Sequence, residues 1–268
     1  MIATDPRVGR WSPFFEVIGG KCSLNSLPSE VIQPGVIAQE MLKMRDFAQE
    51  RDKEQVTGVY HGVDGHRWMM PKEAVDGWYN GVDKAYESGL VPVVAGGNLV
   101  TEIHSHPPMR RWVKERRTSE DDWHLAGAIP SVDDLANVVY PIGAYSHRVG
   151  LSSGIVVGRD LAVMVCKTKQ TTSRNSLENG RANVWVNVSR LIWANFREAE
   201  RRISQETEFN KRLLGTVKSC REFGLGLYLM RLRATRFPQT YRWIRFSPQP
   251  DDIPKAVDLL VGQEADDK

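Results

Sequence analysis

From Val36 to Thr168 the chain alternates segments typical of helices with segments typical of strands, and this alternation limits the fold more than any other feature. Apolar residues recur at helical spacing over 36–52, and a second helical pattern, 131–139, lies between two groups of strand-like runs. The strand-like, β-branched runs are 56–62, 99–106, 149–157 and 161–168. This order predicts an α/β fold in which helices flank a mixed sheet.

The remaining segments give weaker signals. Residues 66–70 follow an Asp64-Gly65 turn, and we expect them to complete a hairpin with the preceding run. Pro71 opens a segment with helical spacing that we expect to continue to about Glu87. Helical patterns return from about Ser189 to Leu214, and then again to about Ala234.

These patterns predict four regions along the chain. The first, rich in Pro, Gly and Ser, is an irregular lead-in that contributes at most a short strand to the body. The others are a main α/β domain, a basic helical C-terminal extension, and an acidic, flexible tail. The four regions are residues 1–35, 36–170, 171–246 and 247–268.

Composition excludes several classes of protein. The three cysteines, Cys22, Cys166 and Cys220, form no CxxC pair, which argues against a disulfide framework and against a cysteine-built zinc site. No stretch approaches the roughly 20 apolar residues of a membrane span. The first residues, MIATDPRVGRW, also lack the apolar region of a signal peptide. We therefore expect a cytoplasmic protein with no membrane partner.

The strongest chemical signal is HSHP at 104–107, followed by PSVDDL at 130–135. In a strand, residues two apart face the same side, so His104 and His106 can converge on one ion. Ser131 and Asp134 are three residues apart and can share one side of the first turn of a helix. Two imidazoles and one carboxylate leave a fourth position for water, which is the arrangement of a catalytic zinc site.

These two motifs resemble those of the JAMM (MPN/JAB, Mov34-like) zinc metallopeptidases of the prokaryotic JAB type, in which an upstream Glu precedes HxHP and SxxD. The resemblance covers about half of the chain and includes the order of helices and strands. It implies a JAMM/MPN-type mixed sheet and one Zn²⁺ per chain. It also implies that His104, His106 and Asp134 are the metal ligands and that Ser131 helps to stabilise the oxyanion.

The same resemblance implies an activity. JAMM metallopeptidases mainly hydrolyse peptide or isopeptide bonds at the C-terminus of ubiquitin-like proteins, and their bacterial members often occur with adenylating enzymes. We therefore expect a zinc-dependent isopeptidase whose substrate is a ubiquitin-like protein or its conjugate. The alternative is a catalytically inactive JAMM-like scaffold, or a nucleic-acid-associated protein similar to RadC, which shares the HxHP and PSxxD features.

The catalytic Glu of the family has two candidate positions here. Counted back from Gly58, its place falls on Gln55, and Glu54 is one residue earlier. A shift of one residue turns a strand side chain to the opposite face, so the choice depends on the local register. An amide cannot act as a base, and we favour Glu54.

The spacing between the motifs also departs from the family, because His106 and Asp134 lie farther apart than usual. Residues 109–129 then form an insertion beside the site, where a loop can gate or select substrate. Within it, His124 is the only other histidine that we consider as an extra ligand.

Several of these residues also have a purely structural explanation. Ser131 is a natural N-cap, and Asp133 suits the positive N-terminal end of a helix. Glu102 shares a strand face with the two histidines and could support a ligand or substitute for the base. However, a solvated or salt-bridged glutamate is the commoner case.

The charge of the chain is distributed unevenly. The total is +3, but 181–246 contains 14 Lys/Arg against five Asp/Glu, with five Trp and Tyr side chains interleaved. Such a segment can bind single-stranded nucleic acid or an acidic protein. It can equally be a pair of amphipathic helices with solvated arginines, and we favour this second explanation because no nucleic-acid-binding motif is present.

Overall fold

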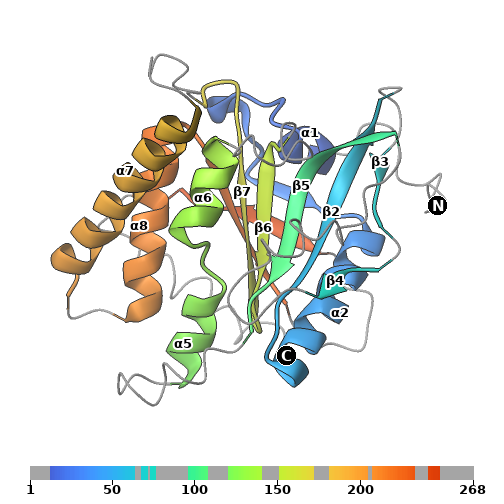
Figure 1. The fold of residues 1–268 in the computed structure, drawn as a ribbon, viewed down its shortest axis with the longest axis horizontal. Helices are drawn as coiled ribbons and strands as arrows, with labels where there is room; N and C mark the ends of the chain where they lie inside the picture. The colour runs from blue at the N-terminus through green and yellow to red at the C-terminus, as the bar shows by residue number, and fades with distance from the viewer. Residues whose placement is uncertain are drawn as a thin grey trace.

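One curled mixed sheet lies between two groups of helices (Figure 1). The chain is therefore of the mixed α/β class that the alternation of its segments predicts. The computed structural model describes residues 13–63, 68–71, 73–76, 96–107, 120–140, 151–171, 181–204, 207–232 and 241–247.

The nine described strands follow the order β1-β9-β8-β7-β6-β5-β2-β3, with β4 beside β2. Of the described pairs, only β5 and β6 run parallel, and the others are antiparallel. The strands are β1 (Glu30–Ile32), β2 (Gln55–Gly62), β3 (Trp68–Met69), β4 (Val75–Asp76), β5 (Gly97–Ser105), β6 (Ser153–Val157), β7 (Leu161–Cys166), β8 (Gly226–Arg231) and β9 (Arg242–Arg245).

The parallel pair determines where the candidate site can form. Two parallel neighbours need a long crossover, and here the chain between them carries α5 (Glu120–Gly127) and α6 (Val132–Val139). The carboxyl end of β5 therefore lies beside the helices that follow it in sequence. Ligands of α/β proteins commonly bind at this end of a strand.

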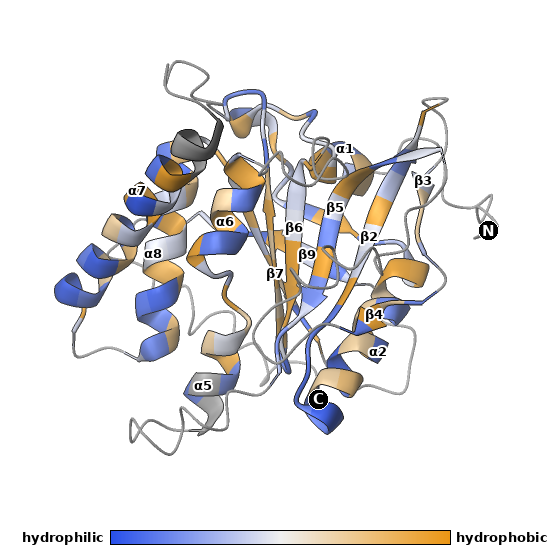
Figure 2. Cartoon of the chain, viewed as in Figure 1, coloured by the Kyte–Doolittle hydropathy of each residue, from blue (hydrophilic) through white to orange (hydrophobic). Residues whose placement is uncertain are grey.

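Each face of the sheet has its own core. On one face, α1 (Pro13–Ile18) and α2 (Gly35–Arg51) pack on the sheet around residues such as Met41, Ile103 and Trp243. On the other, α5 and α6 pack together with α7 (Arg181–Arg202) and α8 (Glu208–Phe223). Because both faces are covered, the central strand β7 is apolar along its whole length, as Figure 2 shows.

Most expected elements of the main domain are confirmed. The helix over 36–52 corresponds to α2, and the hairpin to β2 and β3, which pair antiparallel. The runs at 99–106, 149–157 and 161–168 correspond to β5, β6 and β7, although residues 149–150 lie outside the described residues. Ser131 is the N-cap of α6, as expected.

The expected helix from Pro71 to about Glu87 is wrong at its start. Val75 and Asp76 form β4, which pairs with the first two residues of β2. Pairing with the neighbouring strand outweighs the helical spacing of this short segment. Residue 72 and residues 77–95 lie outside the described residues.

The basic extension is not purely helical. Helices α7 and α8 are present, with α7 starting earlier than expected, but the helix predicted to run on to about Ala234 is wrong. Gly226–Arg231 forms β8, which pairs with β7, and Arg242–Arg245 forms β9. These strands continue the same sheet, so this segment takes part in the core rather than being appended to it.

The lead-in is more ordered than expected. The short strand is confirmed as β1, which pairs with β9. It is preceded by α1 and by one 3₁₀ turn, Leu24–Ser26, and α1 buries Phe14, Val17 and Ile18 completely. Residues 1–12, most of the expected insertion (108–119) and the expected tail from residue 248 onward lie outside the described residues. None of the described helices is long and apolar enough to span a membrane.

Besides the shared apolar core, two specific contacts join helices of this layer. Where α7 crosses α8, Gly215 leaves room for Phe196, whose ring a Cβ on Gly215 would approach to 2.8 Å. Asp122 of α5 accepts the backbone N–H groups of Glu208 (2.8 Å) and Phe209 (3.0 Å), at the start of α8. A buried carboxylate at a helix N-terminus is favourable because the free N–H groups and the helix dipole are positive there.

We expect Asp122→Ala to lower the free energy of unfolding by about 1–3 kcal/mol, because two N–H groups at the start of α8, one in a buried and one in a part-buried hydrogen bond, lose a charged acceptor. Urea denaturation followed by circular dichroism measures the change. Asp160→Ala is the matched control, since Asp160 pairs with Arg159 at the surface, where such pairs contribute about 0–1 kcal/mol. Equal midpoints for Asp122→Ala and wild type would contradict this role of Asp122.

Candidate metal centre

Strand β5 places the two histidines on one side of the sheet. His104 is buried within β5, between β2 and β6, and His106 follows the end of the strand. The backbone N–H of His106 donates to the carbonyl of Val157, so the extended pairing with β6 continues to this residue. Residues two apart in a strand face the same side, and the two Nε2 atoms are 3.2 Å apart.

Helix α6 supplies the third group. Asp134 is in a capping box: its Oδ2 accepts the backbone N–H of Ser131 (2.7 Å), and the hydroxyl of Ser131 accepts the N–H of Asp134 (3.2 Å). This cap fixes the carboxylate so that Oδ1 lies 3.4 Å from Nε2 of His104 and Oδ2 lies 4.0 Å from Nε2 of His106. The structure thus brings together all three predicted ligands.

The three ligand atoms have the spacing of a metal site. They all lie within 4.8 Å of one another. A tetrahedral ion at about 2.0–2.1 Å from each ligand holds those ligands about 3.3 Å apart, close to the distances from Nε2 of His104 to Nε2 of His106 and to Oδ1 of Asp134. Among the described residues this is the one group of three or more His, Cys, Asp or Glu with such a spacing, and it can hold a metal ion.

Hydrogen bonding also prepares His106 for a metal. Its Nδ1 lies 2.6 Å from the carbonyl oxygen of Gly127. A carbonyl only accepts, so Nδ1 carries the proton and the lone pair of Nε2 faces the cluster. Gly127 ends α5, and so the helix in the expected insertion orients a predicted ligand. Nothing in the sequence signals the role of this carbonyl.

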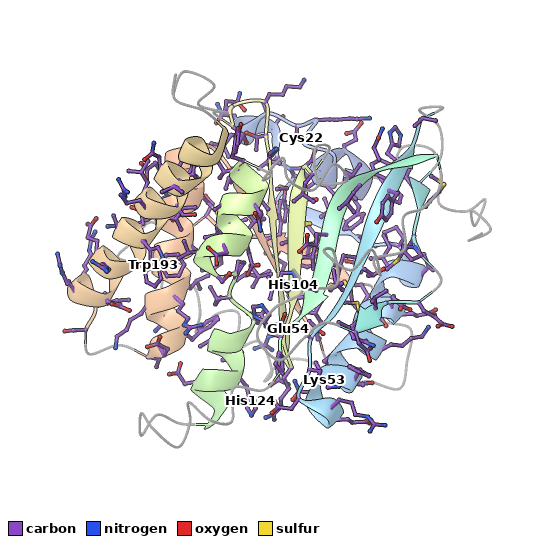
Figure 3. All side chains as sticks on the ribbon, viewed as in Figure 1. Cys22, Lys53, Glu54, His104, His124 and Trp193 are labelled. Carbon is purple, nitrogen blue, oxygen red and sulfur yellow. The ribbon has the colours of Figure 1, made fainter. Side chains whose placement is uncertain are left out.

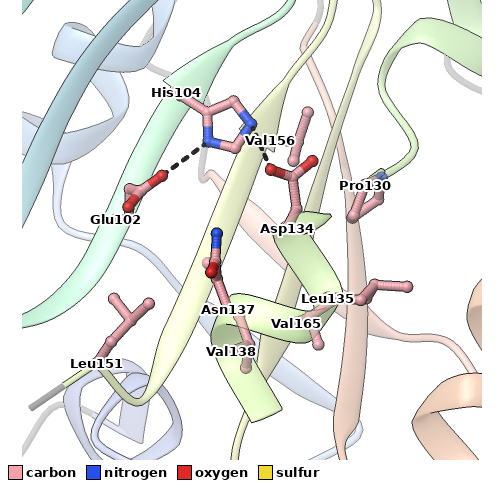
Figure 4. A pocket seen from close by; sticks show the side chains of 11 residues that line it. Glu102, His104, Pro130, Asp134, Leu135, Asn137, Val138, Leu151, Val156 and Val165 are labelled. Atoms are coloured by element: carbon pink, nitrogen blue, oxygen red, sulfur yellow. Dashed lines mark ion pairs between the residues drawn. The ribbon is translucent and has the colours of Figure 1, made fainter. Parts of the chain in front are cut away.

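Glu102 lies next to Nδ1 of His104, as the carbonyl of Gly127 lies next to Nδ1 of His106. It lies two residues earlier on the same face of β5, and its Oε1 is 3.5 Å from Nδ1 of His104 (Figure 4). Both side chains are buried. A carboxylate behind a histidine favours the tautomer with Nδ1 protonated, and this leaves Nε2 free for a metal.

The charges of these groups are strongly coupled. Burial by itself would lower the pKa of His104, but Asp134 and Glu102 hold that pKa well above its usual value. Burial, and then the charge of His104, lower the pKa of His106 to about 4. Burial would raise the pKa of Asp134, but the two histidines and the N–H of Ser131 hold it well below its usual value. These shifts favour the ionised form of Asp134, which is the form that binds a metal.

Exposure to solvent increases across the site. Side-chain exposure rises from 5% at His104 to 13% at His106 and 22% at Asp134. Behind His104, between β5, β6 and α6, a small pocket of about 20 Å³ is lined by Glu102, Asn137 and several apolar side chains, as well as by His104 and Asp134 (Figure 4). This space fits about one water molecule, so any larger substrate must approach from the side of His106 and Ser131.

The strand register separates the two candidates for the catalytic base. Val56 of β2 lies opposite His104 of β5, and directly opposed residues of an antiparallel pair face the same side. Gln55 therefore faces the other side, where its amide donates to Asp76 (2.9 Å). Glu54 lies one residue before β2 begins, and the same alternation, continued to it, would turn its side chain toward the face of the histidines; Figure 3 shows it close to His104 in projection.

The other candidates lie away from the ion site. His124 is buried on α5 and is not in the group of three (Figure 3). Asp133 is exposed in the first turn of α6, as expected for a carboxylate that stabilises the positive N-terminal end of the helix. Tyr60 was not predicted; burial, together with the nearby Glu102, raises its pKa to about 12, which keeps its hydroxyl protonated behind the site.

Comparison with known proteins adds no family to this description. No protein-family model matches the chain. No curated protein and no solved structure is significantly similar to it.

We expect the purified protein to bind about one zinc ion per chain, and His104→Ala and Asp134→Asn to bind almost none, because each variant removes one of three ligands. Asparagine can still accept the N–H of Ser131, so the second variant preserves the cap of α6. Elemental analysis by mass spectrometry measures the zinc. His61→Ala, in which the altered histidine lies on β2 against Trp68, should retain the full amount. A zinc-free wild type, purified without chelator and then incubated with zinc, would exclude this site.

We expect Glu102→Ala to weaken zinc binding by about 10–100-fold, because Nδ1 of His104 loses the carboxylate that orients it. Glu102→Gln should lose less, since the amide oxygen can still accept from Nδ1. Competition with a chromophoric chelator measures the affinity, and Glu50→Ala, on the exposed side of α2, controls for the lost charge. An unchanged affinity in a folded Glu102→Ala protein would show that Glu102 has no such role.

Proposed function

We propose that this protein is a zinc-dependent hydrolase that cleaves a peptide or isopeptide bond. The observation that carries the proposal is the group of His104, His106 and Asp134, whose ligand atoms all lie within 4.8 Å of one another. Two imidazoles and one carboxylate are a donor set of catalytic zinc sites, in which a fourth position stays open. The partial exposure of His106 and Asp134 supports an open position on that side.

A zinc ion at this position would polarise a carbonyl and lower the pKa of a water molecule to about 7. Glu54 is the proposed general base, because its carboxylate belongs to the face of the histidines and can accept a proton. It would later deliver this proton to the leaving amine. The alternative of an inactive scaffold was based on Gln55 taking this place and on the long insertion, and the contact of Gln55 with Asp76 weakens the first of these two grounds.

Ser131 has a second role in this proposal. Its hydroxyl oxygen accepts the N–H of Asp134, but its hydroxyl hydrogen can still donate. The residue is exposed at the start of α6, beside Asp134, on the side where a substrate can enter. From there the hydroxyl can support the oxyanion that develops on the carbonyl under attack.

The proposed substrate is the C-terminal tail of a ubiquitin-like protein, on the basis of the HxHP and SxxD resemblance to the JAMM metallopeptidases. An adenylating enzyme would then belong to the same system. An extended tail can bind by adding a strand to a sheet edge. The outermost described strand on this side of the site is β4, two strands from His104.

We expect Glu54→Gln to lower the rate of cleavage of a ubiquitin-like protein fused at its C-terminus to a reporter by at least about 100-fold, because the variant has no base. Its zinc content should stay at the wild-type value. Gln55→Ala is the matched control and should cleave at nearly the wild-type rate. Electrophoresis over a time course measures the rate.

Each of three results would contradict a different part of this proposal. Equal rates for Glu54→Gln and wild type would exclude Glu54 as the base. A lower rate for Gln55→Ala than for Glu54→Gln would reverse the assignment of the two residues. If zinc-loaded wild type cleaves no fusion of this kind, the substrate class is wrong.

A further inference from the structure

The outer face of α7 carries a row of cations around one exposed tryptophan. Trp193 is 54% exposed, and Arg190, Arg197 and Arg201 are exposed on the same face. At 100° per residue, these four residues lie within about 80° of one another around the helix. We call them the α7 stripe. They line a surface groove of about 740 Å³ together with neighbours such as Val186 and Ala194.

The packing of α7 explains why this face is directed outward. Its opposite face buries Val188, Ile192 and Ala199 in the core. Phe196 packs beside these residues on Gly215 of α8. Since this apolar face is fully used by the fold, the fold itself needs neither Trp193 nor the arginines of the α7 stripe.

The arginines of the α7 stripe have no acidic partner among the described residues. Arg197 lies over the ring of Trp193, at 6.0 Å from its centroid, and no ion pair involves Arg190, Arg197 or Arg201. The adjacent Glu198 pairs with Lys218 of α8, so it does not neutralise them. The exposed Glu200, at the flank of the stripe, removes only part of the positive charge.

We propose that the α7 stripe binds single-stranded nucleic acid, with phosphates on Arg190, Arg197 and Arg201 and a base stacked on Trp193. Unpaired arginines beside an exposed aromatic ring match both parts of such a ligand, its charged backbone and its flat bases. An acidic protein would satisfy the arginines but would not need the ring. From Arg190 to Arg201 the stripe is about 16 Å long, which is long enough to contact several consecutive nucleotides.

The test measures binding of fluorescein-labelled dT20 and rU20 to the full chain by fluorescence anisotropy, between 50 and 200 mM NaCl. Three phosphate contacts predict a slope of about −2 in log affinity against log salt. The triple variant Arg190→Ala/Arg197→Ala/Arg201→Ala should bind at least 10-fold more weakly at 50 mM and should lose most of this slope. Trp193→Ala should weaken binding about 10-fold at every salt concentration, since stacking depends little on salt.

The matched control is Lys21→Ala/Arg51→Ala/Lys169→Ala, which removes three exposed cations away from α7. It should bind like the wild type. An equal loss in both triple variants would show that net charge alone attracts the oligonucleotide, and this result would overturn the proposal.

Two further results would also overturn it: no binding of either oligonucleotide at 50 mM NaCl, or poly-glutamate binding that equals oligonucleotide binding and is unaffected by Trp193→Ala. The second result would assign the surface to an acidic protein. A preference between dT20 and rU20 identifies the kind of strand. Zinc content and fusion cleavage should be unchanged in all α7 variants, so the outcome is independent of the proposed hydrolase.

Discussion

The capping interaction between Ser131 and Asp134 is the contact on which the candidate site depends, because one carboxylate performs two tasks. Its Oδ2 closes the first turn of α6, and its Oδ1 faces His104 on the sheet. A side chain held by its own backbone loses little freedom when it meets a ligand, so the site is preorganised at small entropic cost. Any change that moves the start of α6 also moves a ligand.

The charge balance of the buried cluster favours a divalent ion. Glu102 and Asp134 place two carboxylates next to His104 in the protein interior. A single proton on His104 offsets only one of these charges when both carboxylates are ionised, and uncompensated charge in the interior is costly. A divalent cation with neutral histidines would balance both. The charges of these residues and the spacing of their ligand atoms thus both favour a divalent metal ion.

How far the sequence could predict the structure depended on whether a feature was local. The HxH and SxxD spacings locate the ligands because a strand and the first turn of a helix have fixed geometry. To determine which side Gln55 faces, one needs the register of β2 against β5, and the sequence alone did not specify this register. The carbonyl of Gly127 and the carboxylate of Asp122 act on distant residues, and no local pattern marks them.

The same reasoning explains the error at the C-terminal end. The run GLYLMR at Gly226–Arg231 is short and apolar, and periodicity cannot assign such a run to a strand or a helix. Its pairing with β7 decides the matter, because an interior strand offers it a full set of hydrogen bonds.

This pairing also determines how the two proposed activities can be separated. Deleting 181–246 would remove β8 and β9 from the sheet that carries β5, and would expose the core under α6. Such a variant would lose zinc and nucleic-acid binding together for lack of a fold, whatever the role of α7. Substitutions on the solvent face of α7 leave the sheet intact, so they can distinguish a binding surface from a structural helix.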